Sequence, residues 1–117
     1  MSTSQDDGES WSFAVDTEIP NPGSSLEVIE LQDGHWLMVF NDTEEGRHSL
    51  AAALSDDQGA SWEWKQHIAL VEKGKKSFSY PSVIQSQDGK IHVTYSYSDH
   101  VNKTIKHAVF DVNWIME

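Results

Sequence analysis

The chain has 117 residues, a length typical of a single domain. Hydrophobic residues make up 38% of it and charged residues 23%, which is ordinary for a folded protein and too apolar for a disordered one. Its 19 acidic and 8 basic residues give a formal net charge of -11, so we expect neither nucleic acid nor a membrane as a partner. The chain has no cysteine, which excludes disulfides and thiolate metal sites.

The N-terminal sequence MSTSQDDGES lacks the basic start and the apolar core of a signal peptide. No apolar run approaches the roughly 20 residues that a membrane-spanning helix needs. We therefore expect the chain as written to stay in the cytoplasm. A longer parent protein could carry a signal upstream, since the sequence reads as if it began inside a repeat, so the location stays open.

A turn motif near the N-terminus occurs twice in the chain. Four positions recur with an offset of 51 residues: Ser4, Asp6, Gly8 and Trp11 in the first copy, and Ser55, Asp57, Gly59 and Trp62 in the second. An aspartate and a serine can share the backbone hydrogen bonds of a tight turn, glycine permits a positive φ, and tryptophan packs the turn onto a sheet. The motif therefore predicts a structural role, with no acid–base role for its carboxylates.

Short runs of aromatic and β-branched residues, separated by turn signals, make up the rest of the chain, and no long stretch has a helical period. This pattern predicts an all-β fold. Asp33-Gly34 and Asp88-Gly89 each lie between two such runs, which is a strong hairpin signal. The second hairpin repeats the first with an offset of 55 residues, and self-similarity near this period indicates a propeller or a related array.

The two turn motifs, SQDDGESW and SDDQGASW, resemble Asp boxes, the turns between the third and fourth strands of blades in sialidases and related bacterial-neuraminidase-repeat proteins. The resemblance extends through NPGSSLEVIELQDGHWLMVFND, EGRHSLAAALSDDQGASW, FSYPSVIQSQDGKIHVTYSY and TIKHAVFD, and it covers residues 4 to about 111. These segments are similar to the C-terminal third of predicted bacterial neuraminidases. The resemblance implies antiparallel β-propeller blades, about two per chain, from a six-bladed ring.

On that template, residues 1–117 form one propeller fragment. Residues 11–19 are the outer strand of one blade, residues 26–70 form a full blade, and residues 80–112 supply three strands of a partial blade. One strand, the four strands of the full blade and the three strands of the partial blade together equal two four-stranded blades. The first and last elements look complementary. We therefore expect the strand at 11–19 of one copy to pair with the strand at 105–109 of another, closing a homo-oligomeric ring of three copies. The alternative is a gene fragment whose other blades were cut away.

Consecutive strand connections fall on opposite ends of a blade, so the Asp boxes and the Asp-Gly hairpins share one end. The loops at the other end form the candidate site, and the first of them carries Asp42, Glu44, Glu45, Arg47 and His48. Arg47, the only arginine, could grip the carboxylate of an acidic sugar bidentately, with Glu44 or Glu45 setting its orientation. The alternative is a solvated ion pair of little consequence.

Three residues elsewhere complete the set of candidates: Tyr80, Asp99 and His107. Tyr80 could stack on a sugar, but the sequence favours a place for it in the core. For His107, a packed and hydrogen-bonded role is favoured over a catalytic one. The six histidines show no metal-type spacing, so we expect no metal and no other cofactor.

The resemblance to sialidases implies a catalytic site with a triad of arginines, an acid–base aspartate, and a tyrosine nucleophile assisted by a glutamate. With one arginine, this chain is not expected to inherit that activity. We expect a sialidase-like module, not catalytic alone, with a carbohydrate-binding surface at Arg47 and Tyr80. Two alternatives stay open: a glycoside hydrolase that assembles from Asp42, Glu44 or Asp99 of facing subunits, and a gene-cassette fragment that folds without a function.

Overall fold

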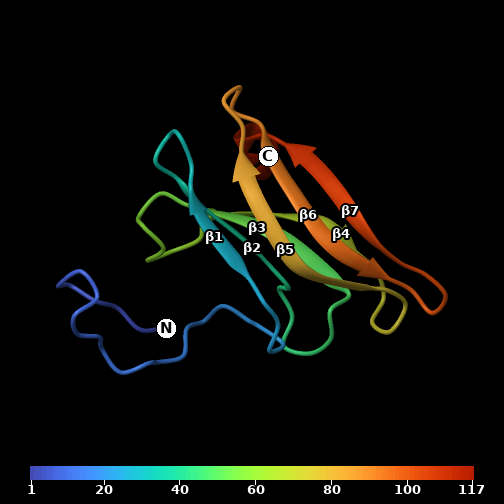
Figure 1. Ribbon diagram of the computed structural model, residues 1–117, viewed down its shortest axis with the longest axis horizontal. Helices are drawn as coiled ribbons and strands as arrows, with labels where there is room; N and C mark the ends of the chain where they lie inside the picture. Colours follow the sequence, from blue (N-terminus) through green and yellow to red (C-terminus); the bar gives the residue numbers. More distant parts are fainter.

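Two antiparallel sheets, packed against each other, make up the fold of residues 1–117 in the computed structural model (Figure 1). The first sheet consists, in spatial order, of β1 (Glu27–Glu30), β2 (Trp36–Phe40), β3 (Ser49–Ser55) and β4 (Trp64–Leu70). The second consists of β5 (Ser77–Gln85), β6 (Ile91–Ser98) and β7 (Lys103–Phe110), and a short helix, α1 (Val112–Met116), follows. Each sheet is a meander, which confirms the predicted all-β fold of antiparallel blades.

The two sheets have the same strand register. Met38 pairs with Ala53 in the first sheet and Val93 pairs with Ala108 in the second, so both partners are displaced by 55 residues. The turns between the first two strands of each sheet also match, because each contains an Asp-Gly pair whose glycine has a positive φ. The strands β1 to β3 and the strands β5 to β7 are therefore two copies of one structural unit, as the repeat predicted.

The main core lies between the two sheets. Every second residue of β2 faces it, including Leu37 and Val39, and Leu54 faces it from β3. Val93 and Tyr95 face the same core from the second sheet. This alternation follows from the two-residue period of a strand, and it gives each sheet one face toward its neighbour.

A smaller apolar cluster covers the other face of the first sheet. It is built on four buried residues, Met38, Phe40, Ala51 and Ala53. Ile19 and Trp62 pack against this cluster. Because both of its faces are covered, β3 is buried along its whole length.

Residues 11–19 form no strand in the single chain. Figure 1 shows the N-terminal segment as an irregular ribbon on the side of the molecule away from β7. Its large side chains are open to solvent, since Trp11 is 63% exposed and Phe13 is 95% exposed. The partner expected for this strand belongs to another copy, so the pairing stays a prediction.

The sequence does not predict α1, because five residues are too few to show a helical period. Asp111 caps this helix, with its Oδ1 accepting a hydrogen bond of 2.9 Å from the backbone N–H of Trp114. Ile115 anchors the helix in the main core. No helix in the structure combines the length and the apolar character that crossing a membrane requires.

Candidate functional site

Three loops meet at the end of the sheets opposite the Asp boxes. They connect β2 to β3, β4 to β5 and β6 to β7, and together they line a pocket of about 310 Å³. The lining residues are 46–48, 73–77 and 98–100, and none of them is hydrophobic. These loops are the ones that the sequence places at the candidate site.

The pocket concentrates positive charge in an acidic chain. Arg47, Lys73, Lys75 and Lys76 line it, which is half of the 8 lysines and arginines in a protein of formal net charge -11. Asp99 is the only carboxylate among the lining residues. Positive charge gathered in a concave site focuses the electrostatic field, so the pocket favours an anionic ligand.

The side chain of Arg47 lies over the ring of Tyr80, with 5.5 Å between the guanidinium carbon and the ring centre. Tyr80 is 63% exposed, so the favoured expectation that it belongs to the core is wrong. The reason is a shift in the pairing of β5 and β6 between Ser79 and Ser82, where Tyr80 has a φ of 52°. An irregularity of this kind re-aims a side chain, and here it turns the ring outward beside the arginine.

Asn41 fixes the loop of Arg47 against β5. Its Nδ2 donates hydrogen bonds to the backbone carbonyls of Ser49 at 2.8 Å and Phe78 at 2.9 Å, and its Oδ1 accepts one from the Ser24 hydroxyl at 2.7 Å. The backbone N–H of Phe78 in turn donates to the carbonyl of Arg47 at 2.7 Å. A buried amide that is fully paired links the two sheets rigidly at the pocket.

Asn41 and the three pocket lysines are not among the site residues that were predicted from the sequence. The signal for the asparagine is its place directly after the five apolar residues of β2. The signal for the lysines is the short basic run at 73–76 in an otherwise acidic chain. Both signals become informative only once the topology brings the two loops together.

The acidic residues of the first loop do not orient Arg47. Glu45 pairs instead with Lys73, with 2.9 Å between Oε2 and Nζ, and this hydrogen bond and charge lower the pKa of Glu45. Glu44 is exposed, and none of the ion pairs in the structure includes Arg47. The expectation that a neighbouring glutamate holds the guanidinium is therefore wrong, and its donors stay open to a ligand.

Asp42 points toward β4 and is not a pocket residue. Its side chain is 4% exposed, and its Oδ2 lies 2.9 Å from Nζ of Lys65 and 2.8 Å from Nε2 of His67. The Ser49 hydroxyl donates to its other oxygen. Burial alone would raise the pKa of Asp42, but the hydrogen bonds from Ser49 and Lys65 and the nearby positive charges lower it overall. This arrangement ties the outer strand of the first sheet to the loop.

Asp99 shapes the third loop of the pocket. Its Oδ1 accepts hydrogen bonds from the backbone N–H groups of Asn102 at 2.6 Å and Val101 at 2.8 Å. These two bonds, with that of Asn102 the stronger influence, lower the pKa of Asp99. The carboxylate therefore stays charged and serves the turn.

His107 lies outside the pocket, on an exposed face of the second sheet. It stacks on His92 with ring centres 5.3 Å apart, and Nδ1 of His92 lies 3.1 Å from Nε2 of His107.

The structure brings some of the candidate residues to the pocket. Arg47, His48 and Asp99 line it, while Tyr80 adjoins it through Arg47 and Glu45 adjoins it through Lys73. The structure does not bring Asp42, Glu44 or His107 to the pocket.

Both Asp boxes form the predicted turn at the other end of the sheets. In the second box, the Ser55 hydroxyl accepts from the backbone N–H of Gly59 and Asp57 accepts from that of Ser61, each at 2.8 Å. The first box repeats these bonds, from Gly8 to Ser4 and from Ser10 to Asp6, each at 2.8 Å. The serine before each tryptophan is thus a box residue that was not predicted from the sequence. Its bonds to the aspartate, together with the hydroxyl of the first serine of the box, lower the pKa of Asp6 and of Asp57 to about 2.

Comparison with known proteins bears on the same elements. A family model described as a BNR repeat-like domain matches residues 1–93, a range that includes both Asp boxes and the whole first sheet. A search of curated proteins found no match to the chain. The structure brings together no group of three or more histidine, aspartate or glutamate side chains that could hold a metal ion.

Proposed function

Because the chain belongs to the family of BNR repeat-like domains, we propose that it is a carbohydrate-binding propeller module that recognises an acidic sugar in the pocket around Arg47. One observation carries the proposal: half of the basic residues of an acidic chain line a single pocket. A carboxylate-bearing sugar supplies the charge that this pocket favours.

The pair of Arg47 and Tyr80 suits the two parts of such a ligand. A guanidinium presents a rigid fork of donors that matches a carboxylate, and this one is held in place through its backbone rather than by an ion pair. The exposed ring of Tyr80 beside it offers an apolar surface with a polar tip, on which a sugar ring can lie. Lysines 73, 75 and 76 add charge around the pair.

The carboxylates near the pocket support binding over hydrolysis. A general acid for glycoside cleavage needs a pKa raised toward the working pH. Hydrogen bonds and neighbouring charges lower the pKa of Asp42 and of Asp99 instead. Both groups are also occupied by partners in the fold, which disfavours the hydrolase that would assemble from them.

The test is a glycan array of acidic and neutral sugars combined with a sialoside turnover assay. Wild-type protein is compared with Arg47→Ala and with Lys90→Ala, which removes the same charge outside the pocket. We expect binding to acidic glycans without turnover, a loss of binding in Arg47→Ala, and full binding in Lys90→Ala. Turnover abolished by Arg47→Ala would favour the hydrolase, and the absence of both binding and turnover would favour a fragment without a ligand.

A further inference from the structure

The second sheet has a free edge and a free face. β7 is its edge strand, and no segment pairs with the outer side of β7. On the face turned away from the first sheet, Ile84, Ile105 and Val109 are 62%, 67% and 48% exposed. An unpaired strand edge beside exposed apolar side chains is a template for pairing with another strand.

The N-terminal segment, residues 1–19, carries apolar side chains that no sheet covers, whereas its last residue, Ile19, packs on the first sheet. Phe13 and Val15 are 95% and 63% exposed. Figure 1 shows this segment and β7 on opposite sides of the molecule. The segment therefore cannot complete the second sheet of its own chain without leaving its place.

Backbone contacts show that the N-terminal segment is equivalent to β4. The N–H of Ser12 donates to the carbonyl of Thr3 at 2.8 Å, as the N–H of Glu63 donates to the carbonyl of Leu54 at 3.1 Å. Both atoms of the first pair are displaced by 51 residues from the second. In the single chain, residues 1–3 lie beside residues 12–15 in the way that β3 lies beside β4, and no longer strand takes that place.

We propose that residues 13–19 of a second copy pair with β7 as β4 pairs with β3. β7 corresponds to β3 with an offset of 55 residues, and residues 13–19 correspond to β4 with an offset of 51. Transfer of the observed register of β3 and β4 gives three diagnostic pairs: Val109 with Phe13, His107 with Val15, and Lys106 with Asp16. β7 is a longer partner than residues 1–3, so the exchange gains backbone hydrogen bonds.

The transferred register is chemically complementary. Asp16 and Lys106 carry opposite charges, and Phe13 and Val109 are both apolar. Pairs of these kinds stabilise an antiparallel sheet when they lie directly opposite each other. Because one copy gives a strand and its neighbour receives it, the contact is heterologous and closes into a ring when the rotation permits.

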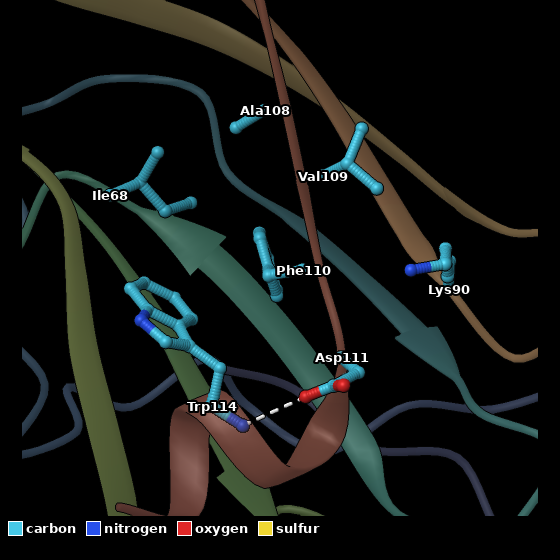
Figure 2. Close-up of a pocket in the computed structure, with 7 residues that line it drawn as sticks. All are labelled: Ile68, Lys90, Ala108, Val109, Phe110, Asp111 and Trp114. Carbon is cyan, nitrogen blue, oxygen red and sulfur yellow. Dashed lines mark hydrogen bonds between the residues drawn. The ribbon is translucent and has the colours of Figure 1, made fainter.

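A cavity beside β7 is placed to receive the indole of Trp11. It has a volume of about 300 Å³, and Figure 2 shows the apolar side chains that line it, among them Ile68, Ala108, Phe110 and Trp114. In the first sheet, Trp62 packs against the cluster that contains Ala53. Trp11 corresponds to Trp62 and Ala108 to Ala53, so the exchanged strand carries the indole of the second copy to this cavity.

The experiment uses paired cysteines, since the chain has none of its own. Directly opposite residues of antiparallel strands have Cα atoms about 4.5–5.5 Å apart, which is within the range of a disulfide. The variant Val15→Cys with His107→Cys is oxidised and examined on a non-reducing gel. The control, Val15→Cys with Lys106→Cys, puts the second thiol on the opposite face of β7.

We expect covalent oligomers from the first variant and at least a tenfold smaller yield from the control. A monomeric product from the first variant, whether reduced or closed by an intramolecular disulfide, would overturn the proposal. Equal yields from the two variants would also overturn it, because they would show random collision instead of a fixed register. Circular dichroism of both variants before oxidation identifies a variant that has failed to fold. In that case light scattering of the wild-type chain tests the assembly, and the mass of a single chain would overturn the proposal.

Discussion

The guanidinium carbon of Arg47 lies 5.5 Å from the centre of the Tyr80 ring, across the junction of the two sheets. Arg47 comes from the loop after β2 and Tyr80 from the irregular part of β5. The two side chains come from different sheets, so they meet only because the sheets pack against each other. The pair is therefore a product of blade packing, and it joins the charged and the apolar parts of the proposed sugar site.

Replacement of Tyr80 tests the apolar part of that site. Tyr80→Ala removes the ring beside Arg47, and we expect a two- to fivefold loss of affinity for an acidic sugar, the effect of an exposed cation–π and stacking contact. Tyr80→Phe keeps the ring and should bind within a factor of two of the wild type. Fluorescence titration with one acidic glycoside measures both variants, and equal losses in the two would assign the effect to the hydroxyl instead of the ring.

Salt tests the electrostatic part. The distance over which charges act falls from about 30 Å at 0.01 M salt to about 8 Å at 0.15 M. Because four cationic side chains line the pocket, we expect affinity for an acidic sugar to fall steadily over this range. Tyr80→Ala should lower the affinity without changing the slope. An affinity independent of salt would show that the lysines take no part.

The Asp boxes predict how stability depends on pH. The pKa of Asp57 is lowered from 3.8 to about 2, chiefly by the hydroxyl of Ser61, so its ionised form stabilises the folded state above pH 4. That contribution is lost as the pH falls through 2. Asp57→Asn should be less stable than the wild type at pH 7, and its stability should change less between pH 4 and pH 2.

Urea midpoints at pH 7, 4 and 2 measure this effect. Asp56→Asn removes the same charge from the adjacent, exposed position, and it should follow the wild type at every pH. An Asp56 variant that matched the Asp57 variant would show that net charge, and not the turn, sets the dependence.

Asp42 is expected to matter for stability and not for sugar binding. Asp42→Ala leaves Lys65 and His67 without their shared partner, and we expect a loss of about 1–3 kcal/mol in the free energy of unfolding. Glu44→Ala, two residues away and exposed, should change it by less than about 0.5 kcal/mol. Urea denaturation measures both, and a matched loss of sugar binding by folded Asp42→Ala would place this residue in the site after all.

Exchange of charge tests the assembly. We expect Asp16→Lys or Lys106→Asp alone to shift the protein toward single chains, because each puts like charges opposite each other in the proposed register. The double variant should recover the assembly, with a mass about three times that of the 13.2 kDa chain if six blades close the ring. Light scattering measures all three, and a double variant no better than the singles would exclude this pairing.

Much of the fold follows from local sequence, because turns and strands depend on neighbouring residues. The Asp boxes and the Asp-Gly hairpins repeat with offsets that the structure reproduces, and β1 to β4 all lie between residues 26 and 70. The site follows only in part. Arg47 was identifiable as the single arginine, but the outward turn of Tyr80 depends on a shift in strand pairing, for which the sequence gives only Pro81 inside β5 as a sign.

The pairing of Glu45 shows a second limit. Proximity in sequence favoured Arg47 as its partner, whereas the fold brings Lys73 from the next loop within 2.9 Å. α1 shows a third, since a five-residue helix capped by Asp111 has too short a pattern to recognise. For Glu45, a contact between segments distant in sequence decides the outcome, and such contacts appear only when the sheets are packed.

Calorimetric titration tests the recognition of a sugar carboxylate by Arg47 most directly. The ligands are the methyl glycoside of a sialic acid and its carboxyl methyl ester, which differ only in the charge that the guanidinium is proposed to hold. We predict that the wild type binds the acid about 10- to 100-fold more tightly than the ester, and that Arg47→Ala loses this preference. Equal affinity for acid and ester, or a preference for the acid that survives Arg47→Ala, would contradict the account.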